Sequence, residues 1–315
     1  MSFSIDTKNE IAHLTQEKKC CMIAEIAGFI RMCGSIRLAG GGKIKIVIST
    51  DNLAVARHYK ILIKEYFGVD AKSDEEHGMT RKKGDPYLLI IGAEEMSEQI
   101  LRETGILMIR EGMNYISDGI YEGLIKTKCC RKAYLRGVFL GSGTISDPKK
   151  GYHMEIVCSS QVLANDVKKL INSFVGLHAK QVQRKKSYVV YVKESEQIVD
   201  ILNILKAHGQ LLKFEDVRIM KEMRNKANRI NNCDSANLDK TLNAAQKQVE
   251  AIQKIEIKKG LESLPEKLYQ VAILRLENPD ASLQEMADMM EPPLKKSGMN
   301  HRLKKIEEIA NKLSI

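Results

Sequence analysis

The sequence predicts an α+β protein in which an αββαββα unit occurs twice, related by a pseudo-twofold axis, with an all-α domain after it. Three observations support this prediction. Residues 17–36 and 126–145 align with each other without a gap. The alternating and amphipathic segments that follow each copy come in the same order. From residue 236 onward, the apolar spacing is helical only.

The two aligned stretches are predicted to be paired central helices. Their matched positions are all 109 residues apart: Cys20 and Cys129, Cys21 and Cys130, Gly28 and Gly137, Gly34 and Gly143, and Ile36 and Ile145. Each stretch reads as an apolar helix that ends at a glycine and turns into a strand. A glycine in the middle of each helix allows two backbones to approach closely. We therefore expect the two helices to form the seam of the fold.

The remainder of each half follows the same order. Residues 43–72 parallel 153–180, where a strand ends in Ser or Thr as a helix N-cap signal and an amphipathic helix follows. Residues 81–101 parallel 184–202, each with a basic tip, a β run and a helix that contains Ser-Glu-Gln-Ile. The predicted domain spans 1–212. Its halves are about 1–101 and 126–212, joined by 102–125.

Residues 213–235 are predicted to be a basic helical connector, and 236–315 a helical domain. The first helix of that domain carries one apolar stripe and ends at Gly260; the stripe is Leu238, Leu242, Ala245, Val249 and Ile252. Leu264-Pro265 opens the next helix. Ser282 with Glu285 forms a capping box for a third, which Pro292-Pro293 stops. Ser297 is predicted to cap a last helix that runs to about Leu313.

Composition favours a polyanionic partner. The net charge is +10 and the pI about 9.1. No apolar run reaches the length of a membrane span and no signal peptide is visible, so we expect a cytoplasmic protein without a membrane partner. Seven cysteines, with four in adjacent pairs, do not form a disulfide framework. The two pairs would meet if the helices pair, but zinc sites usually use spaced ligands, so buried small residues are the favoured interpretation.

The last two helices resemble a helix-turn-helix, although the turn EPPLKK is longer than usual. Between Lys295 and Lys305 there are five Lys or Arg residues and no acid. Such a face can neutralise phosphates and read base edges. The alternative is a solvated basic helix in an ordinary bundle. The candidate DNA-binding residues are Lys295, Lys296, Ser297, Asn300, His301, Arg302, Lys304 and Lys305.

The hairpin tips of the two halves form a second basic surface. Paired about the central helices, they would flank a shared sheet and contact phosphates on two sides. The alternative is that charged tips only maintain solubility. The candidate residues are Lys43, Lys45, Arg81, Lys82 and Lys83 in the first half, and Lys149, Lys150, Arg184, Lys185 and Lys186 in the second.

Catalysis is not expected, and no cofactor or metal is predicted. A metal-dependent nuclease needs carboxylates at the ends of the central helices, because Mg²⁺ prefers hard oxygen ligands. Those ends carry Cys33 and Ser142. Asp147 is near but lies beyond the second helix, without a counterpart in the first copy.

Residues 26–34 and 135–143 resemble the LAGLIDADG motif of homing endonucleases, a family with paired central helices and a β saddle on DNA. The acidic, metal-binding motif position corresponds to Cys33 and Ser142. This resemblance implies the fold and argues against the activity. End to end, the chain is similar to the WhiA family, through RNKANRINNCDSANLDKTLNAAQKQ (224–248) and SLQEMADMMEPPLKKSGMNHRLKK (282–305). That family joins a degenerate LAGLIDADG-like domain to a C-terminal helix-turn-helix.

The resemblance implies a non-catalytic, sequence-specific regulator that binds double-stranded DNA and associates with the nucleoid. It would act in cell division and chromosome segregation or in sporulation. One alternative is a division-associated scaffold that binds a protein partner through the LAGLIDADG-like domain. A remote alternative is a Mg²⁺-dependent endonuclease. Two internal halves supply the symmetry that a dimer would otherwise provide, so a monomer would suffice.

Overall fold

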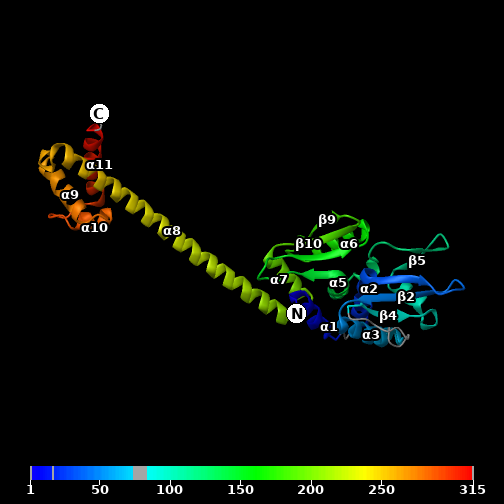
Figure 1. Ribbon diagram of the computed structural model, residues 1–315. Helices are drawn as coiled ribbons and strands as arrows, with labels where there is room; N and C mark the ends of the chain where they lie inside the picture. Colours follow the sequence, from blue (N-terminus) through cyan, green and yellow to red (C-terminus); the bar gives the residue numbers. More distant parts are fainter. Residues whose placement is uncertain (1, 16–17, 74–83, 314–315) are drawn as a thin grey trace. The chain divides into compact units, whose positions relative to one another are not determined.

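The computed structural model describes residues 2–15, 18–73 and 84–313 (Figure 1). It divides into two compact units, Met1–Met220 and Lys221–Ile315. The first unit contains the repeated α+β fold, and the second contains helices only. The predicted fold class is therefore confirmed.

Two helices lie side by side at the centre of the first unit, α2 (Lys19–Cys33) and α5 (Lys128–Ser142). Their closest approach is at the two predicted glycines. A Cβ added at Gly28 would lie 2.4 Å from the Tyr134 carbonyl oxygen, and one added at Gly137 would lie 2.1 Å from the Glu25 carbonyl oxygen. The backbones touch at these two points, so neither position has room for a side chain. The predicted seam is confirmed.

The first half forms a four-stranded antiparallel sheet in the order β1-β2-β4-β3. Its strands are β1 (Gly34–Leu38), β2 (Ile44–Thr50), β3 (Lys72–Ser73) and β4 (Tyr87–Ile91). Helix α3 (Leu53–Phe67) begins at the Asn52 cap and ends at Gly68, whose φ is +73°. The turn η2 (Ala93–Glu95) and helix α4 (Ser97–Glu103) close the half. The cap is Asn52 rather than the Ser or Thr that ends the strand.

The second half repeats this arrangement in the order β7-β8-β10-β9. Its strands are β7 (Gly143–Ile145), β8 (Met154–Cys158), β9 (Lys180–Arg184) and β10 (Ser187–Val192). Helix α6 (Gln161–Asn172) begins at Ser160, whose hydroxyl accepts from the Leu163 N–H as predicted. Helix α7 (Ser195–Ile204) completes the unit. The order αββαββα is thus present twice.

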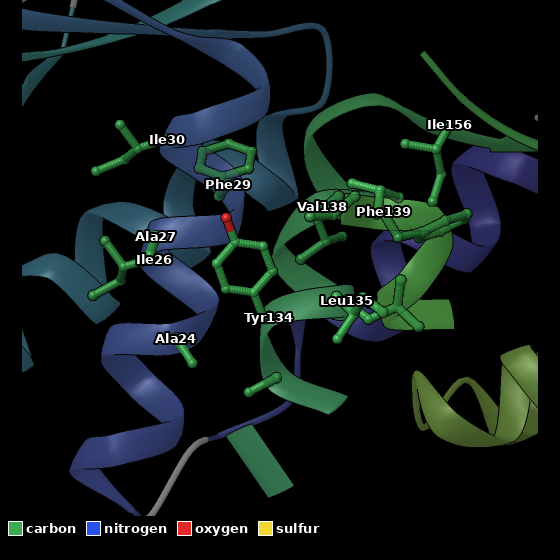
Figure 2. Packing of buried hydrophobic residues seen from close by; sticks show 14 of the residues in the cluster. Ala24, Ile26, Ala27, Phe29, Ile30, Tyr134, Leu135, Val138, Phe139 and Ile156 are labelled. Carbon is green, nitrogen blue, oxygen red and sulfur yellow. The ribbon is translucent and has the colours of Figure 1, made fainter. Parts of the chain in front are cut away.

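One apolar core runs through both halves and across the seam. Figure 2 shows the Tyr134 side chain between the two central helices, with Ala27 and Phe29 on one side and Val138 on the other. The residues of α2 from Cys21 to Ile30 are all buried, which explains why this helix is apolar on every side. The two halves therefore share one core instead of forming two separate domains.

Two elements of the first unit were not predicted. Helix α1 (Phe3–Ala12) packs against α3 and α5, and its Ser4 hydroxyl accepts from the Ile145 N–H. The hairpin of β5 (Leu107–Arg110) and β6 (Met113–Ile116) lies in the joining segment, followed by the turn η3 (Glu122–Leu124). Arg31 of α2 donates to the Gly105 and Ser117 carbonyls and so fixes this segment to the seam.

Helix α8 (His208–Lys259) is continuous through residues 213–235, where a separate connector was predicted. The unit boundary at 220/221 falls inside it. The predicted apolar stripe is correct only toward its end. Ala245 and Ile252 are buried, whereas Leu238 and Leu242 are exposed, because the predicted periodicity continues beyond the helices that cover it.

The second unit packs the end of α8 against the turn η4 (Leu261–Ser263) and the helices α9 (Glu266–Glu277), α10 (Leu283–Asp288) and α11 (Lys296–Lys312). Gly260, with φ +77°, ends α8 as predicted. The Ser282–Glu285 capping box is confirmed. Ser297 is not the cap of α11: Lys295 holds that position and has no side-chain cap bond, so the helix starts two residues earlier than predicted.

Within the described ranges, the structure contains no helix long and apolar enough to span a lipid bilayer.

Candidate nucleic-acid interface

Helix α11 has one buried side and one basic side. Met299, Leu303, Ile306 and Ala310 are buried against α9 and α10, at the spacing of one helical stripe. The opposite side is solvent-exposed. Of the eight residues predicted there, six are exposed and the remaining two, Asn300 and Arg302, are half-buried; the exposed six are Lys295, Lys296, Ser297, His301, Lys304 and Lys305.

The basic charge is concentrated in the first turns of α11. The first turn contains no acid, and the acidic pair Glu307 and Glu308 lies in the second half of the helix. Lys295 occupies the N-cap position, but its side chain makes no capping hydrogen bond with the first backbone N–H groups of the helix. A helix N-terminus with unpaired N–H groups and neighbouring lysines favours an anion such as a backbone phosphate.

The outward face of the first sheet carries an additional basic pair. Lys45, a predicted residue, lies directly across from Arg37 of β1, which was not predicted. Both point away from the core, on the face opposite Ile36, Ile46 and Ile48. The alternation in residues 34–38 was a signal that could have identified Arg37. Lys43 is exposed at the β1–β2 turn, 3.4 Å from Glu94. Arg81, Lys82 and Lys83 lie outside the described residues.

The second sheet bears the matching basic residues of the second half. Lys149 and Lys150 are exposed in the turn before β8, and Lys185 and Lys186 are exposed in the β9–β10 turn. Arg184 differs because its guanidinium lies 2.9 Å from the Glu155 carboxylate. Burial raises the pKa of Glu155, but the hydrogen bond from His153 and the charge of Arg184 more than offset it, so the pKa is lowered. Arg184 is thus partly neutralised within the protein.

The two motif positions at the ends of the central helices do not suit a hard metal ion. The Cys33 thiol donates to the Phe29 carbonyl oxygen at 3.1 Å, and burial raises its pKa, so it stays neutral. The Lys8 ammonium lies close enough to influence Cys33 electrostatically. Ser142 offers a buried hydroxyl without a charge. A neutral thiol and a hydroxyl beside a lysine provide none of the carboxylate oxygens that Mg²⁺ requires.

An open cavity of about 760 Å³ lies next to this end of the seam. Lys8, Arg57 and Asp51 are among its lining residues, with Gly141 and Thr144 from the end of α5 and the start of β7. Asp51 is the one carboxylate in this lining. Burial lowers the pKa of Lys8, and the negative charge of the nearby Asp51 partly counteracts this shift. The balance of charge therefore favours an anion over a divalent cation.

The four cysteines at the opposite end of the seam do come together, as pairing of the helices requires. Cys21 and Cys130 are buried, whereas Cys20 and Cys129 are exposed. The four Sγ atoms all lie within 4.8 Å of one another. Burial of every thiol was the favoured interpretation, and for the exposed two it is wrong.

Comparison with protein families accounts for nearly the whole chain. Residues 19–107 match the WhiA N-terminal LAGLIDADG-like domain and residues 131–224 the WhiA LAGLIDADG-like domain. Residues 227–310 match the WhiA C-terminal HTH domain. The chain belongs to the WhiA family.

Curated WhiA relatives are similar along their full length. A protein of Thermoanaerobacter pseudethanolicus named "Probable cell division protein WhiA" is 48% identical over 313 residues, 99% of this chain and 98% of the relative. One of Clostridium perfringens with the same name is 47% identical over the same shares. A solved structure, "full-length DUF199/WhiA from Thermatoga maritima", has a TM-score of 0.59 and 24% identity and covers 99% of both chains. It shows that the WhiA fold is shared.

Proposed function

We propose that this WhiA protein is a non-catalytic, sequence-specific DNA-binding regulator whose helix α11 reads base edges. The observation that carries the proposal is the exposed, acid-free basic stretch from Lys295 to Lys305. Lys304 and Lys305 would neutralise phosphates, and Arg302 and Asn300, at the edges of the face, would contact bases. Residues 236–315 would form this DNA-binding domain.

The LAGLIDADG-like domain, residues 1–212, would contribute non-specific phosphate contacts. Its outward sheet faces carry Arg37, Lys45 and the exposed tips at Lys149, Lys150, Lys185 and Lys186. These side chains are cations without base-reading geometry of their own, so they would increase affinity without selecting sequence. Residues 213–235 of α8 would connect the two DNA-binding surfaces.

The proposed absence of nuclease activity follows from the two motif positions at the ends of the central helices. The Cys33 and Ser142 positions lack carboxylates, and Lys8 places a positive charge nearby. The regulated process is suggested by the relatives, whose names give cell division. We extend that role to this chain, together with chromosome segregation or sporulation, in a cytoplasmic, nucleoid-associated protein that acts on double-stranded DNA.

Genomic footprinting with full-length protein tests the proposal. The parent is expected to enrich one sequence motif, and Arg302→Ala should retain DNA binding but lose preference at about one base position, since one bidentate contact discriminates by roughly 1–3 kcal/mol. Lys312→Ala, at the far end of α11, is the matched control and should leave the motif unchanged. A parent without sequence preference, or an Arg302→Ala variant with the parental motif, contradicts the assignment.

A second function, a division-associated scaffold, is supported by one feature of the joining segment. The β5–β6 hairpin exposes apolar side chains on both of its faces: Ile109 and Ile116 on one face, and Met113 and Tyr115 on the other. Apolar side chains clustered on a surface commonly mark protein contacts. The two functions separate in cells that lack the endogenous protein. If Lys304→Glu/Lys305→Glu abolishes DNA binding yet restores normal division, the scaffold function is favoured; if it fails to restore division, DNA binding is required.

A further inference from the structure

Four thiols meet where the two central helices begin. Cys20 and Cys21 are the second and third residues of α2, and Cys129 and Cys130 hold the same positions in α5. All seven cysteines of the chain are free thiols, so none of these four is held by a disulfide. The end of the seam where they lie is opposite to Cys33 and Ser142, so the proposed DNA-binding function assigns them no role.

The geometry of the cluster matches a four-coordinate site. All four Sγ atoms lie within 4.8 Å of one another. A zinc–sulfur bond is about 2.3 Å long, so sulfurs at the corners of a tetrahedron lie about 3.8 Å apart. Closing the cluster onto one ion therefore requires side-chain movements on the order of 1 Å or less. An iron–sulfur cluster would require a wider arrangement, since iron and inorganic sulfide occupy the space between the thiolates.

The symmetry of the fold fits the symmetry of a tetrahedron. Two ligands come from each helix, and the helices are related by the pseudo-twofold repeat. A tetrahedron has a twofold axis that exchanges two pairs of corners. Neighbouring helical side chains diverge by about 100°, so one Cys-Cys pair can supply two corners of a site that the other pair completes. Two adjacent cysteines on each helix can therefore bind one ion together, without the usual C-x₂-C spacing.

Two opposite effects act on the charge of the cluster. Both pairs lie in the first turn of a helix, where backbone N–H groups and the helix dipole stabilise thiolates, whereas burial raises the pKa of the Cys21 and Cys130 thiols. Lys18 and Lys19 flank the first pair, and Arg131 and Lys132 follow the second. A divalent ion with four thiolates carries a net charge of −2, which these cations and dipoles would partly neutralise.

We propose that Cys20, Cys21, Cys129 and Cys130 together bind one thiophilic divalent cation of the zinc type. The ion joins the N-terminal ends of α2 and α5 and is structural, because four protein ligands leave no open position for substrate. Each thiol that is protonated before binding releases its proton to solvent, and no electron is transferred. Cys20 and Cys129 are exposed and give the ion access to the site.

Metal content and cobalt spectroscopy of full-length protein test this directly. The protein is purified in a reducing buffer without a metal-affinity step and analysed for zinc. We expect one zinc per chain. Replacement by Co²⁺ should give the intense visible bands of tetrahedral cobalt and a thiolate-to-cobalt charge-transfer band. Four of the seven thiols should react slowly with a thiol reagent until a chelator is added. The measurement requires no DNA, so it is independent of the proposed DNA-binding function.

Two variants complete the design. Cys20→Ser/Cys129→Ser alters only the exposed thiols and is expected to lose stoichiometric zinc and the cobalt spectrum. Cys233→Ser removes an exposed thiol of α8 and should keep both. The cobalt spectrum and the thiol protection of the parent protein test whether the four thiols bind an ion, even if the double variant fails to fold.

Three results would overturn the proposal. The first is a reduced parent that takes up no zinc and shows only the spectrum of octahedral cobalt. The second is a double variant that is folded and retains the parental zinc content. The third is mass spectrometry of protein isolated without reductant that shows disulfides between the two pairs and no metal, which would assign the cluster to thiol oxidation instead.

Discussion

The Arg136 guanidinium of α5 lies 3.0 Å from the Glu25 carboxylate of α2, and both side chains are almost completely buried. The other carboxylate oxygen lies 3.0 Å from His58 Nε2 of α3. These positions are not equivalent in the repeat, since the aligned residue of Glu25 is Tyr134. The pseudo-twofold seam therefore contains an asymmetric polar contact. Such a contact fixes one register between the halves, because each buried charge needs its partner.

Removing one partner of this ion pair should be strongly destabilising. Arg136→Met is expected to lower the free energy of unfolding by about 3–5 kcal/mol, since Glu25 would remain buried without its main counter-charge. Glu25→Gln/Arg136→Met should cost less than the sum of the two single changes. Tyrosine fluorescence during urea unfolding measures this, because the chain has no Trp and Tyr269 is the one tyrosine beyond residue 220. Additive effects in the double variant would contradict a direct coupling.

The contact between the central helices predicts an unusually costly alanine. Gly137→Ala places a Cβ 2.1 Å from the Glu25 carbonyl oxygen, which is backbone and has little freedom to move. We expect a loss of at least about 2 kcal/mol, the cost of overpacking a tight core. Gly298→Ala is the control: it lies within α11 and its Cβ would meet no atom within 4 Å. The control should be neutral or stabilising, since alanine favours helix. Equal effects of the two substitutions on the thermal midpoint would contradict the close approach.

The salt dependence of DNA affinity should report the α11 lysines. Removing one phosphate contact flattens the slope of log K against log salt by about 0.9. Lys305→Ala is expected to show this loss on every DNA sequence tested, whereas Lys312→Ala, beyond Glu308, should retain the parental slope. Fluorescence anisotropy with a labelled duplex at several salt concentrations measures both. A Lys305→Ala slope equal to that of the parent would place the contact surface elsewhere.

No DNA cleavage is expected from the pure protein with Mg²⁺ or Mn²⁺. The Cys33 thiol is buried and neutral, and Lys8 disfavours a cation beside it. Nicking of a supercoiled plasmid is a sensitive assay, with an active metal-dependent nuclease as the positive control. Cleavage that persists through purification and disappears in Cys33→Ala/Ser142→Ala would establish an enzyme and refute the non-catalytic function.

Much of the fold was predictable because the chain encodes it twice. The repeat at a fixed offset, the strand alternation and the glycines at positions 28 and 137 depend on local periodicity and on backbone size, which a sequence displays directly. The central seam, both sheets, the capping box at Ser282 and the end of α8 at Gly260 were found in this way. The basic face of α11 was also predicted, and six of its eight residues are exposed, whereas Asn300 and Arg302 are half-buried.

The predictions failed where a residue's environment depends on distant parts of the chain. The α8 stripe at Leu238 and Leu242 has helical spacing, but both side chains are exposed. No prediction was made for Arg275 of α9, which is 1% exposed and donates to the Ala281 carbonyl at 2.6 Å. The β5–β6 hairpin was missed because its strands are short and most of its side chains are exposed, so no alternation of buried and exposed residues marks it.

Two copies of one unit that face each other across a glycine-lined seam could be predicted from the residues alone, because size and periodicity are local properties. Which side chains meet across that seam depends on how the helices pack. Glu25 pairs with Arg136 at its middle, Lys8 lies near Cys33 at one end, and four thiols converge at the other. Each of these contacts joins residues far apart in the chain. Their chemistry depends on distances that arise only when the helices pack.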